Sequence, residues 1–196
     1  MAASGDTIGF AEIREWALSR TRGTGVEIGC GDGRNFEYIP EGVALTAIEP
    51  DKGLAAAARE RARGLDVTVV RGVAARIDMP TADVDFVVST LTLCTVSSLE
   101  SSLYEIHRVL KDGGLLVVVE HNVANSPSFA AWQRVADSLW PHLSGGCRTN
   151  RDIVSAITEA GFDAVEFDWF DFPSKRSLSP ARTMFKGVFE KAAPEG

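Results

Sequence analysis

The sequence is poor in cysteine and has no cysteine pattern typical of a disulfide framework or a zinc site. Only three occur among 196 residues, at Cys30, Cys94 and Cys147. They are odd in number, lie far apart in the chain and form no CxxC pair, whereas zinc-binding and disulfide-rich domains use closely spaced or paired cysteines. The sequence therefore predicts neither a disulfide framework nor a bound metal.

Long apolar runs and an excess of basic residues are also missing. No segment approaches the roughly 18 consecutive apolar residues of a membrane-spanning helix, and residues 1–9 lack the basic-then-apolar order of a signal peptide. Acidic residues outnumber basic ones by 27 to 20, which disfavours nucleic acid as a partner because its binding needs clustered Lys and Arg. We therefore expect a cytoplasmic protein without a membrane anchor or a nucleic-acid partner.

The chain does contain a regular alternation of apolar strand segments with helical segments. The expected strands are 26–28, 44–48, 66–71, 84–89, 115–120, 165–170 and 183–190. The expected helices are 7–20, one opening near 34–35, 51–63, 98–110, 129–139 and 151–160. This alternation predicts an α/β fold with a doubly wound, Rossmann-like sheet, whose ligands bind beyond the carboxyl ends of the strands. No repeat or long linker divides the chain, so we expect a single domain over residues 1–196.

The first expected strand leads into a glycine-rich turn that is preceded by a carboxylate. Glu27 is followed by Gly29, Gly31 and Gly33 at alternate positions, and glycine permits a tight turn and the close approach of a ligand. The spacing is GxGxG, whereas dinucleotide-binding enzymes use GxGxxG. A carboxylate at Glu27 suits a ligand with sulfonium and ammonium groups and suits a pyrophosphate badly. A plain strand-to-helix turn and a dehydrogenase remain the alternatives.

A second carboxylate, Glu49, ends the second expected strand. It lies about 20 residues after Gly29, at the position from which a carboxylate can accept hydrogen bonds from both hydroxyls of a ribose. An ordinary charged residue at a strand end is the alternative for Glu49 alone. Together with the glycine turn, Glu49 favours a bound nucleoside.

The segment Glu27–Gly33, Glu49 and the later segment Arg108–Gly114 resemble the class I S-adenosylmethionine (SAM)-dependent methyltransferases. Within that family they are similar to the group that includes the ubiquinone and menaquinone biosynthesis methyltransferases. The resemblance covers the chain from Gly25 onward and implies SAM as the cofactor. It also implies a seven-stranded sheet, mostly parallel, with an antiparallel C-terminal strand.

The same resemblance implies a set of cofactor-binding residues in the glycine turn and in the loops after the next three strands. These are Glu27, Gly29, Cys30, Gly31, Gly33, Asn35, Glu49, Pro50, Gly72, Val73, Ala74, Thr90 and Leu91. Val73 departs from the family pattern, in which Asp or Asn often binds the adenine amino group. We therefore expect adenine to be held by backbone groups and apolar contacts, or by the nearby Asp78.

Four later segments resemble the branch that contains the alkyl-thiol methyltransferases and their bacterial relatives. They are Leu93–Val96, Glu120–His121, Trp132 and Gly146–Arg151. This resemblance implies a small, lipophilic acceptor with a thiol, hydroxyl or amine group, bound over the ends of the fourth and fifth strands beneath a cap formed by residues 121–150. Membrane-bound members carry an N-terminal hydrophobic anchor, which this sequence lacks.

Two histidines are candidate general bases, because the unperturbed pKa of imidazole lies near neutrality. His121 follows the fifth strand and His142 lies in the expected cap; loop packing is the alternative role for each. Trp132, Trp140 and Cys147 are candidate acceptor-binding residues, although packing is an equally ordinary role for them. The expected reaction is an in-line displacement at the methyl carbon, and the alternative is a protein that binds SAM without transferring its methyl group.

The segment before the first strand is short. We expect residues 1–24 to form a lid helix over the cofactor, with Phe10 and Trp16 facing inward. A second copy of the chain, giving a homodimer, is the other way to complete so open a site.

Overall fold

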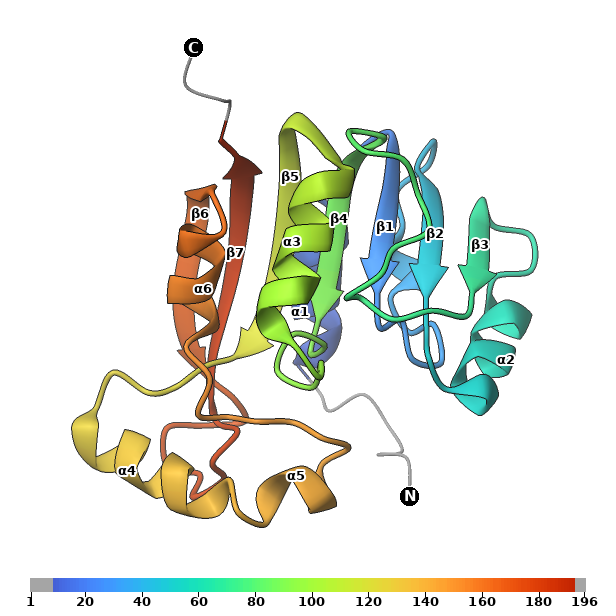
Figure 1. Cartoon of the computed structure of the whole chain (residues 1–196). Helices are drawn as coiled ribbons and strands as arrows, with labels where there is room; N and C mark the ends of the chain where they lie inside the picture. Colours follow the sequence, from blue (N-terminus) through green and yellow to red (C-terminus); the bar gives the residue numbers. More distant parts are fainter. Residues whose placement is uncertain (1–8, 193–196) are drawn as a thin grey trace.

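The computed structural model describes residues 9–192, which form one seven-stranded sheet with helices on both faces (Figure 1). The strands are β1 (Thr24–Ile28), β2 (Ala44–Ile48), β3 (Val67–Val70), β4 (Val84–Thr90), β5 (Leu110–His121), β6 (Phe162–Asp171) and β7 (Thr183–Lys191). Their order across the sheet is β3-β2-β1-β4-β5-β7-β6. Strand β7 is antiparallel to β5 and β6, and the other neighbouring pairs are parallel. The predicted mostly parallel sheet with an antiparallel C-terminal strand is confirmed.

Helices bury both faces of the central strands. The helices are α1 (Phe10–Leu18), α2 (Lys52–Arg61), α3 (Leu99–Val109), α4 (Pro127–Ala136), α5 (Trp140–Leu143) and α6 (Ile153–Glu159). Apolar side chains of α3 and α6 pack in the core on one face, and those of α1 and α2 pack in the core on the other. The centre of strand β4 is therefore buried on both sides, which explains the consecutive apolar residues Phe86, Val87 and Val88. Within residues 9–192, no helix combines the length and the apolarity that crossing a bilayer requires.

Three local expectations need correction. The helix expected after the glycine turn is only a 3-10 turn, Phe36–Tyr38, because Gly31 and Gly33 are left-handed and Pro40 follows closely. The strand expected over 115–120 is longer, because β5 begins at Leu110, directly after α3. The helix expected over 129–139 ends at Ala136, and the short helix α5 follows it.

The carboxyl ends of β1 to β5 meet at one edge of the sheet. Helices α4 and α5 lie beyond this edge, below the arrowheads of β4 and β5 in Figure 1. The chain order reverses between β1 and β4, which are neighbours in the sheet although β2 and β3 intervene in the sequence. In a doubly wound sheet, the loops that diverge at such a point leave room for a ligand.

Candidate active site

Two adjoining cavities lie at this edge of the sheet. The first, of about 460 Å³, lies beside the loops that follow β2 and β3. The second, of about 660 Å³, extends from the glycine turn toward α5 and the loop before β7. Gly29, Leu54 and Leu91 line both cavities, so a single elongated ligand can occupy the two together.

The glycine turn after β1 has a backbone that favours glycine at each of its three glycine positions. Gly29, Gly31 and Gly33 have φ angles of 64°, 57° and 85°, a region that side chains with a Cβ rarely adopt. A Cβ at Gly29 would lie 2.4 Å from the side chain of Thr92, whereas a Cβ at Gly31 would meet no atom within 4 Å. Gly31 also lines the second cavity, so its missing side chain leaves room for a ligand against the backbone.

Glu49 directly follows β2 and forms a hydrogen bond with the glycine turn. One carboxylate oxygen accepts a hydrogen bond of 2.9 Å from the backbone N–H of Gly31, and the other accepts one of 2.9 Å from that of Asp51. Each oxygen retains a lone pair, and Glu49 lines the first cavity. The predicted residues Pro50, Gly72, Val73 and Ala74 line this cavity too. Asp78, the alternative partner for adenine, does not.

Glu27 is a buried carboxylate in which one oxygen is hydrogen-bonded and the other, among the described residues, is not. Its Oε1 accepts a hydrogen bond of 2.7 Å from Asn35, whose amide also donates to Thr90. Its Oε2 is buried and has no hydrogen-bond partner among the described residues. Burial raises the pKa of Glu27 to about 7, although the Asn35 hydrogen bond and the charge of Arg14 act in the opposite direction. Glu27 lines the second cavity, where a cationic ligand group would relieve this cost of burial.

Glu120, near the end of β5, holds the loop that follows β4. It is fully buried, and one of its oxygens accepts hydrogen bonds from the backbone N–H groups of Thr92 and Leu93, at 2.6 and 2.7 Å. Its other oxygen accepts a bond of 3.2 Å from the N–H of Cys94. Burial raises the pKa of Glu120, while its hydrogen bonds, led by that from Ser89, lower it. A carboxylate with this many donors fixes the loop in one conformation.

Arg151 fixes the same loop from its other side. Its guanidinium donates to the carbonyls of Leu93 and Val96, at 2.8 and 2.7 Å. Asn122, the residue after β5, accepts hydrogen bonds from the first two N–H groups of α6. The end of β5 therefore joins the loop after β4 to the segment before α6.

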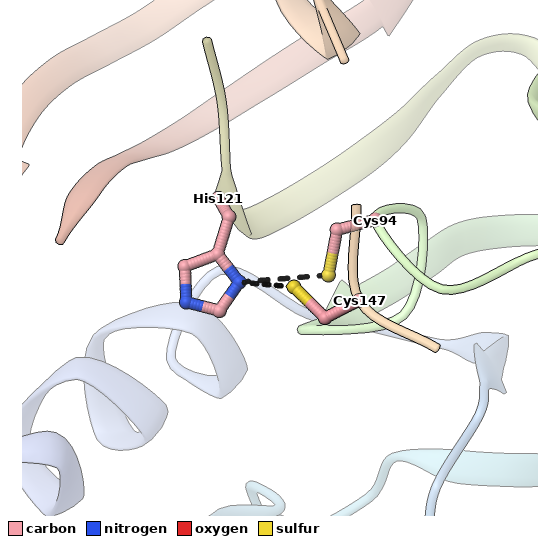
Figure 2. A group of neighbouring side chains, drawn as sticks. All are labelled: Cys94, His121 and Cys147. Atoms are coloured by element: carbon pink, nitrogen blue, oxygen red, sulfur yellow. Dashed lines mark hydrogen bonds between the residues drawn. The ribbon is translucent and has the colours of Figure 1, made fainter. Parts of the chain in front are cut away.

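His121, between Glu120 and Asn122, lies beside two cysteines (Figure 2). Its Nδ1 is 3.5 Å from Sγ of Cys94 and 3.2 Å from Sγ of Cys147. A hydrogen bond from Cys94, followed by the contact with His121, holds the pKa of Cys147 well below its ordinary value. The same hydrogen bond, together with burial, raises the pKa of Cys94. The cluster therefore pairs one thiol that favours its ionised form with one that does not.

The predicted acceptor-side residues separate into two groups. His121 and Trp140 line the second cavity, and Cys147 is buried behind them, in contact with His121. Trp132 and His142 are exposed and line neither cavity; the indole N–H of Trp132 donates to the carbonyl of Leu178.

The predicted lid helix lies only partly over the cavity. Residues 1–8 fall outside the described residues, and α1 packs against the sheet. Phe10 and Arg14 line the second cavity, as expected for Phe10. Trp16 packs against the core but lines neither cavity. Its indole N–H donates to Glu166, and the guanidinium of Arg20 lies over its ring.

Several residues at the site gave no recognisable signal in the sequence. Arg14 and Leu54 belong to helices, and Phe172 and Met184 belong to the C-terminal part of the chain; all four line the second cavity. Glu120 belongs to a segment that carries the resemblance to the alkyl-thiol methyltransferase branch, but its hydrogen bonds to the loop after β4 were not predicted.

Comparison with known proteins agrees with this geometry. A family model described as a methyltransferase domain matches residues 26–118. The thiol S-methyltransferase TMT1B of Rattus norvegicus is 33% identical over 172 residues, which cover 85% of this chain and 70% of that protein. The thiol S-methyltransferase TMT1A of Homo sapiens is 31% identical over 170 residues, covering 84% of this chain and 70% of that protein.

A solved structure has the same fold at low sequence identity. Geranyl diphosphate methyltransferase in complex with SAM superposes with a TM-score of 0.69 at 17% identity, covering 93% of this chain and 84% of the other. The fold, the glycine turn between two carboxylates and the related sequences lead to one conclusion. The chain belongs to the class I SAM-dependent methyltransferases.

Proposed function

We propose that this enzyme transfers the methyl group of SAM to the thiol of a small, largely apolar molecule. The observation that carries the proposal is the continuous pair of cavities, polar at the glycine turn and apolar toward the cap. The names of the relatives at 31–33% identity support a sulfur acceptor, and the shape and chemistry of the second cavity support a small one.

The residues around the glycine turn fit the amino-acid part of SAM. Oε2 of Glu27, the buried oxygen that has no partner among the described residues, would accept a hydrogen bond from the ammonium group. Open space over Gly31 admits the ligand against the backbone. Because an unpaired buried carboxylate is costly, a cation at this point stabilises both the ligand and the turn.

The first cavity fits the nucleoside. The remaining lone pairs of Glu49 accept hydrogen bonds from the ribose hydroxyls. Val73 and Ala74 would hold adenine by apolar contact and backbone groups, in place of the side-chain hydrogen bond that Val73 cannot make. The remaining proposed cofactor-binding residues belong to the turn and to the end of β4: Cys30, Gly33, Asn35 and Thr90. Leu91 lines both cavities.

The second cavity fits an apolar acceptor. Its lining away from the turn includes Phe10, Trp140, Phe172 and Met184. Among the lining residues, His121 is the one imidazole, and its Nδ1 already contacts two sulfur atoms. A thiol, with an ordinary pKa near 8.5, ionises without a strong base, so it suits this site better than an alcohol. The proposal gives no catalytic role to the exposed His142.

Catalysis then rests on orientation and the exclusion of water. SAM, when bound, would supply a methyl group activated by a positively charged sulfur. The acceptor sulfur would bond to the methyl carbon in line, and S-adenosylhomocysteine would leave. The loop fixed by Glu120 and Arg151 holds Leu91 between the cavities, and the cap side chains keep the acceptor out of solvent. Such positioning supplies a large part of the rate in reactions of this kind.

The experiment is a calorimetric titration with SAM and S-adenosylhomocysteine, followed by assays with labelled SAM on matched thiols, phenols and amines. We expect both ligands to bind and label to pass chiefly to apolar thiols. Transfer only to phenols or amines, or binding without transfer to any acceptor, would contradict the proposal. For a variant that removes the charge of Glu27, the control is Glu37→Gln, which changes an exposed carboxylate in the 3-10 turn.

A further inference from the structure

Two cysteines and a histidine from three separate segments meet behind the acceptor cavity. Cys94 lies in the loop after β4, His121 ends β5 and Cys147 precedes α6 (Figure 2). Their two Sγ atoms and the imidazole nitrogen all lie within 4.8 Å of one another. Both cysteines are fully or nearly buried, with exposed fractions of 0% and 5%, so the thiols are shielded from bulk solvent.

The spacing of these atoms matches that of a tetrahedral metal centre. Zinc binds sulfur at about 2.3 Å and imidazole nitrogen at about 2.0 Å, which places neighbouring nitrogen and sulfur ligands about 3.6 Å apart. The two sulfurs lie 3.5 and 3.2 Å from Nδ1 of His121. Both nitrogen–sulfur separations lie within a few tenths of an ångström of this value, and the two sulfurs lie within 4.8 Å of each other.

The surrounding hydrogen bonds hold the three ligands together without a metal. The N–H of Cys94 donates to Glu120, and the carbonyl of Cys94 accepts a bond of 2.9 Å from the N–H of Arg148, next to Cys147. Arg151 connects the same two segments. Backbone restraint of this kind is typical of metal sites, whose ligands are oriented by their neighbours.

We propose that Cys94, His121 and Cys147 bind a thiophilic divalent metal ion such as Zn²⁺, with a fourth position that takes the sulfur of the acceptor thiol. Two thiolates and a neutral imidazole balance the charge of the ion, so the buried centre is electrically neutral. Three protein ligands leave one position open, as in catalytic zinc sites. His121 lines the second cavity, so the cluster adjoins the acceptor end of the site.

The role of the ion rests on the proposed thiol acceptor. Coordination removes the thiol proton to solvent and keeps the sulfur as a thiolate in an apolar cavity. The sulfur then forms its bond to the methyl carbon while the bond from that carbon to the sulfonium breaks, and the electron pair of the broken bond stays on S-adenosylhomocysteine. The product thioether is neutral, so it binds the ion weakly and leaves.

Metal binding is tested first, without SAM, on reduced full-length protein treated with a chelator and then supplied with Zn²⁺ or Co²⁺. We expect about one equivalent to be retained, and we expect Co²⁺ to give the near-ultraviolet absorption of cobalt–thiolate bonds. Cys94→Ser and Cys147→Ser should each weaken binding at least 100-fold, whereas Cys30→Ser, which changes the third buried cysteine, should not. Protein that binds S-adenosylhomocysteine but retains neither ion, including protein that only forms a Cys94–Cys147 disulfide, overturns the proposal.

The fourth position is tested by adding an apolar thiol to the Co²⁺-loaded protein. We expect the thiol to shift the visible cobalt bands and the corresponding alcohol to leave them unchanged. Bands that the thiol does not shift overturn acceptor coordination. Protein that holds Co²⁺ through this cluster but methylates no thiol supports the metal site and contradicts the proposed function, so the two failures are distinguishable. Because the spectra are recorded on the unsubstituted chain, the result does not depend on the folding of the variants.

Discussion

Glu27 combines burial with an oxygen that no described residue satisfies. Desolvation raises the pKa of Glu27 to about 7 from an ordinary value of 4.5, so the folded, ligand-free protein holds this proton more tightly than the unfolded chain does. The stabilising effect of that proton is present below about pH 4.5 and is lost as the pH rises through about 7. A cationic ligand reverses this preference, because it favours the ionised carboxylate.

We therefore predict that the affinity for SAM rises by roughly tenfold between pH 6 and pH 7.5, since one pKa unit corresponds to a factor of ten, and then levels off. In Glu27→Gln, the affinity should be at least about tenfold lower at pH 8 and its pH dependence should be flat, because a hydrogen bond to a charged group contributes about 1.5–3 kcal/mol. Calorimetry across the pH range measures both effects. Glu37→Gln should retain the profile of the parent protein, and a Glu27→Gln variant that also retains it would contradict the role given to Glu27.

In the glycine turn, the surroundings of the two outer glycines differ from those of the middle one. Gly29 and Gly33 are packed against side chains, whereas a Cβ at Gly31 would enter open space on the cavity side. The strain of a left-handed alanine is about 1–2 kcal/mol. Gly31→Ala should therefore fold, with the added methyl group occupying space that the ligand needs.

We predict that Gly31→Ala lowers the free energy of unfolding by about 1 kcal/mol and reduces SAM affinity by more than about tenfold. Gly42 is the matched control, because its φ of 81° is also left-handed, a Cβ there meets nothing within 4 Å, and it lines neither cavity. Gly42→Ala should lose similar stability and no affinity. Urea unfolding and calorimetry separate the two effects, and equal losses of affinity in both variants would argue against ligand contact at Gly31.

The loop after β4 depends on side chains from other elements. Arg151→Met removes two hydrogen bonds to loop carbonyls, and we predict a loss of about 2 kcal/mol in the free energy of unfolding. Faster hydrogen exchange should appear in residues 92–96. Arg63→Met is the control, because Arg63 and its partner Glu60 are 76% and 63% exposed; such a surface pair contributes at most about 1 kcal/mol. Similar losses in the two variants would show that Arg151 does not fix the loop.

For the whole molecule, a ligand that binds only the folded chain must raise its thermal stability. At a concentration of 100 Kd, S-adenosylhomocysteine should stabilise the protein by about 2.7 kcal/mol. For a chain of this size, we predict a rise in Tm of roughly 5–11 °C. Differential scanning fluorimetry checks this, with adenosine monophosphate as a control nucleotide that lacks the amino-acid group. An equal shift with that control would contradict a site built for SAM.

The glycine turn after β1 and the carboxylate after β2 could be predicted from the sequence because their signals are local. Glu27 and the three glycines lie within one short segment, and Glu49 follows at the end of the next strand. The 3-10 turn at Phe36–Tyr38 was not predicted, since helical spacing over so few residues does not reveal the strain imposed by two left-handed glycines.

The contacts around the second cavity could not be predicted from the sequence, because they join distant parts of the chain. Cys94 and Cys147 lie 27 and 26 positions on either side of His121, and nothing in their spacing indicates that they meet. Trp132 and Trp140 lie in similar apolar surroundings in the sequence, yet only Trp140 lines the cavity. Tertiary packing decides which of two similar residues faces a ligand, and the sequence alone does not contain that information in a local form.

The carboxyl end of β5 has a consequence for how such enzymes diverge. Glu120, His121 and Asn122 are consecutive, and each holds a different segment: the loop after β4, the paired thiols and the start of α6. Variation at these three positions disturbs several segments at once, whereas variation on the outer surface of α4 and α5 disturbs none of them. Under the proposed function, acceptor preference can therefore change by mutation in α4 and α5 while β5 and the segments that it holds stay intact.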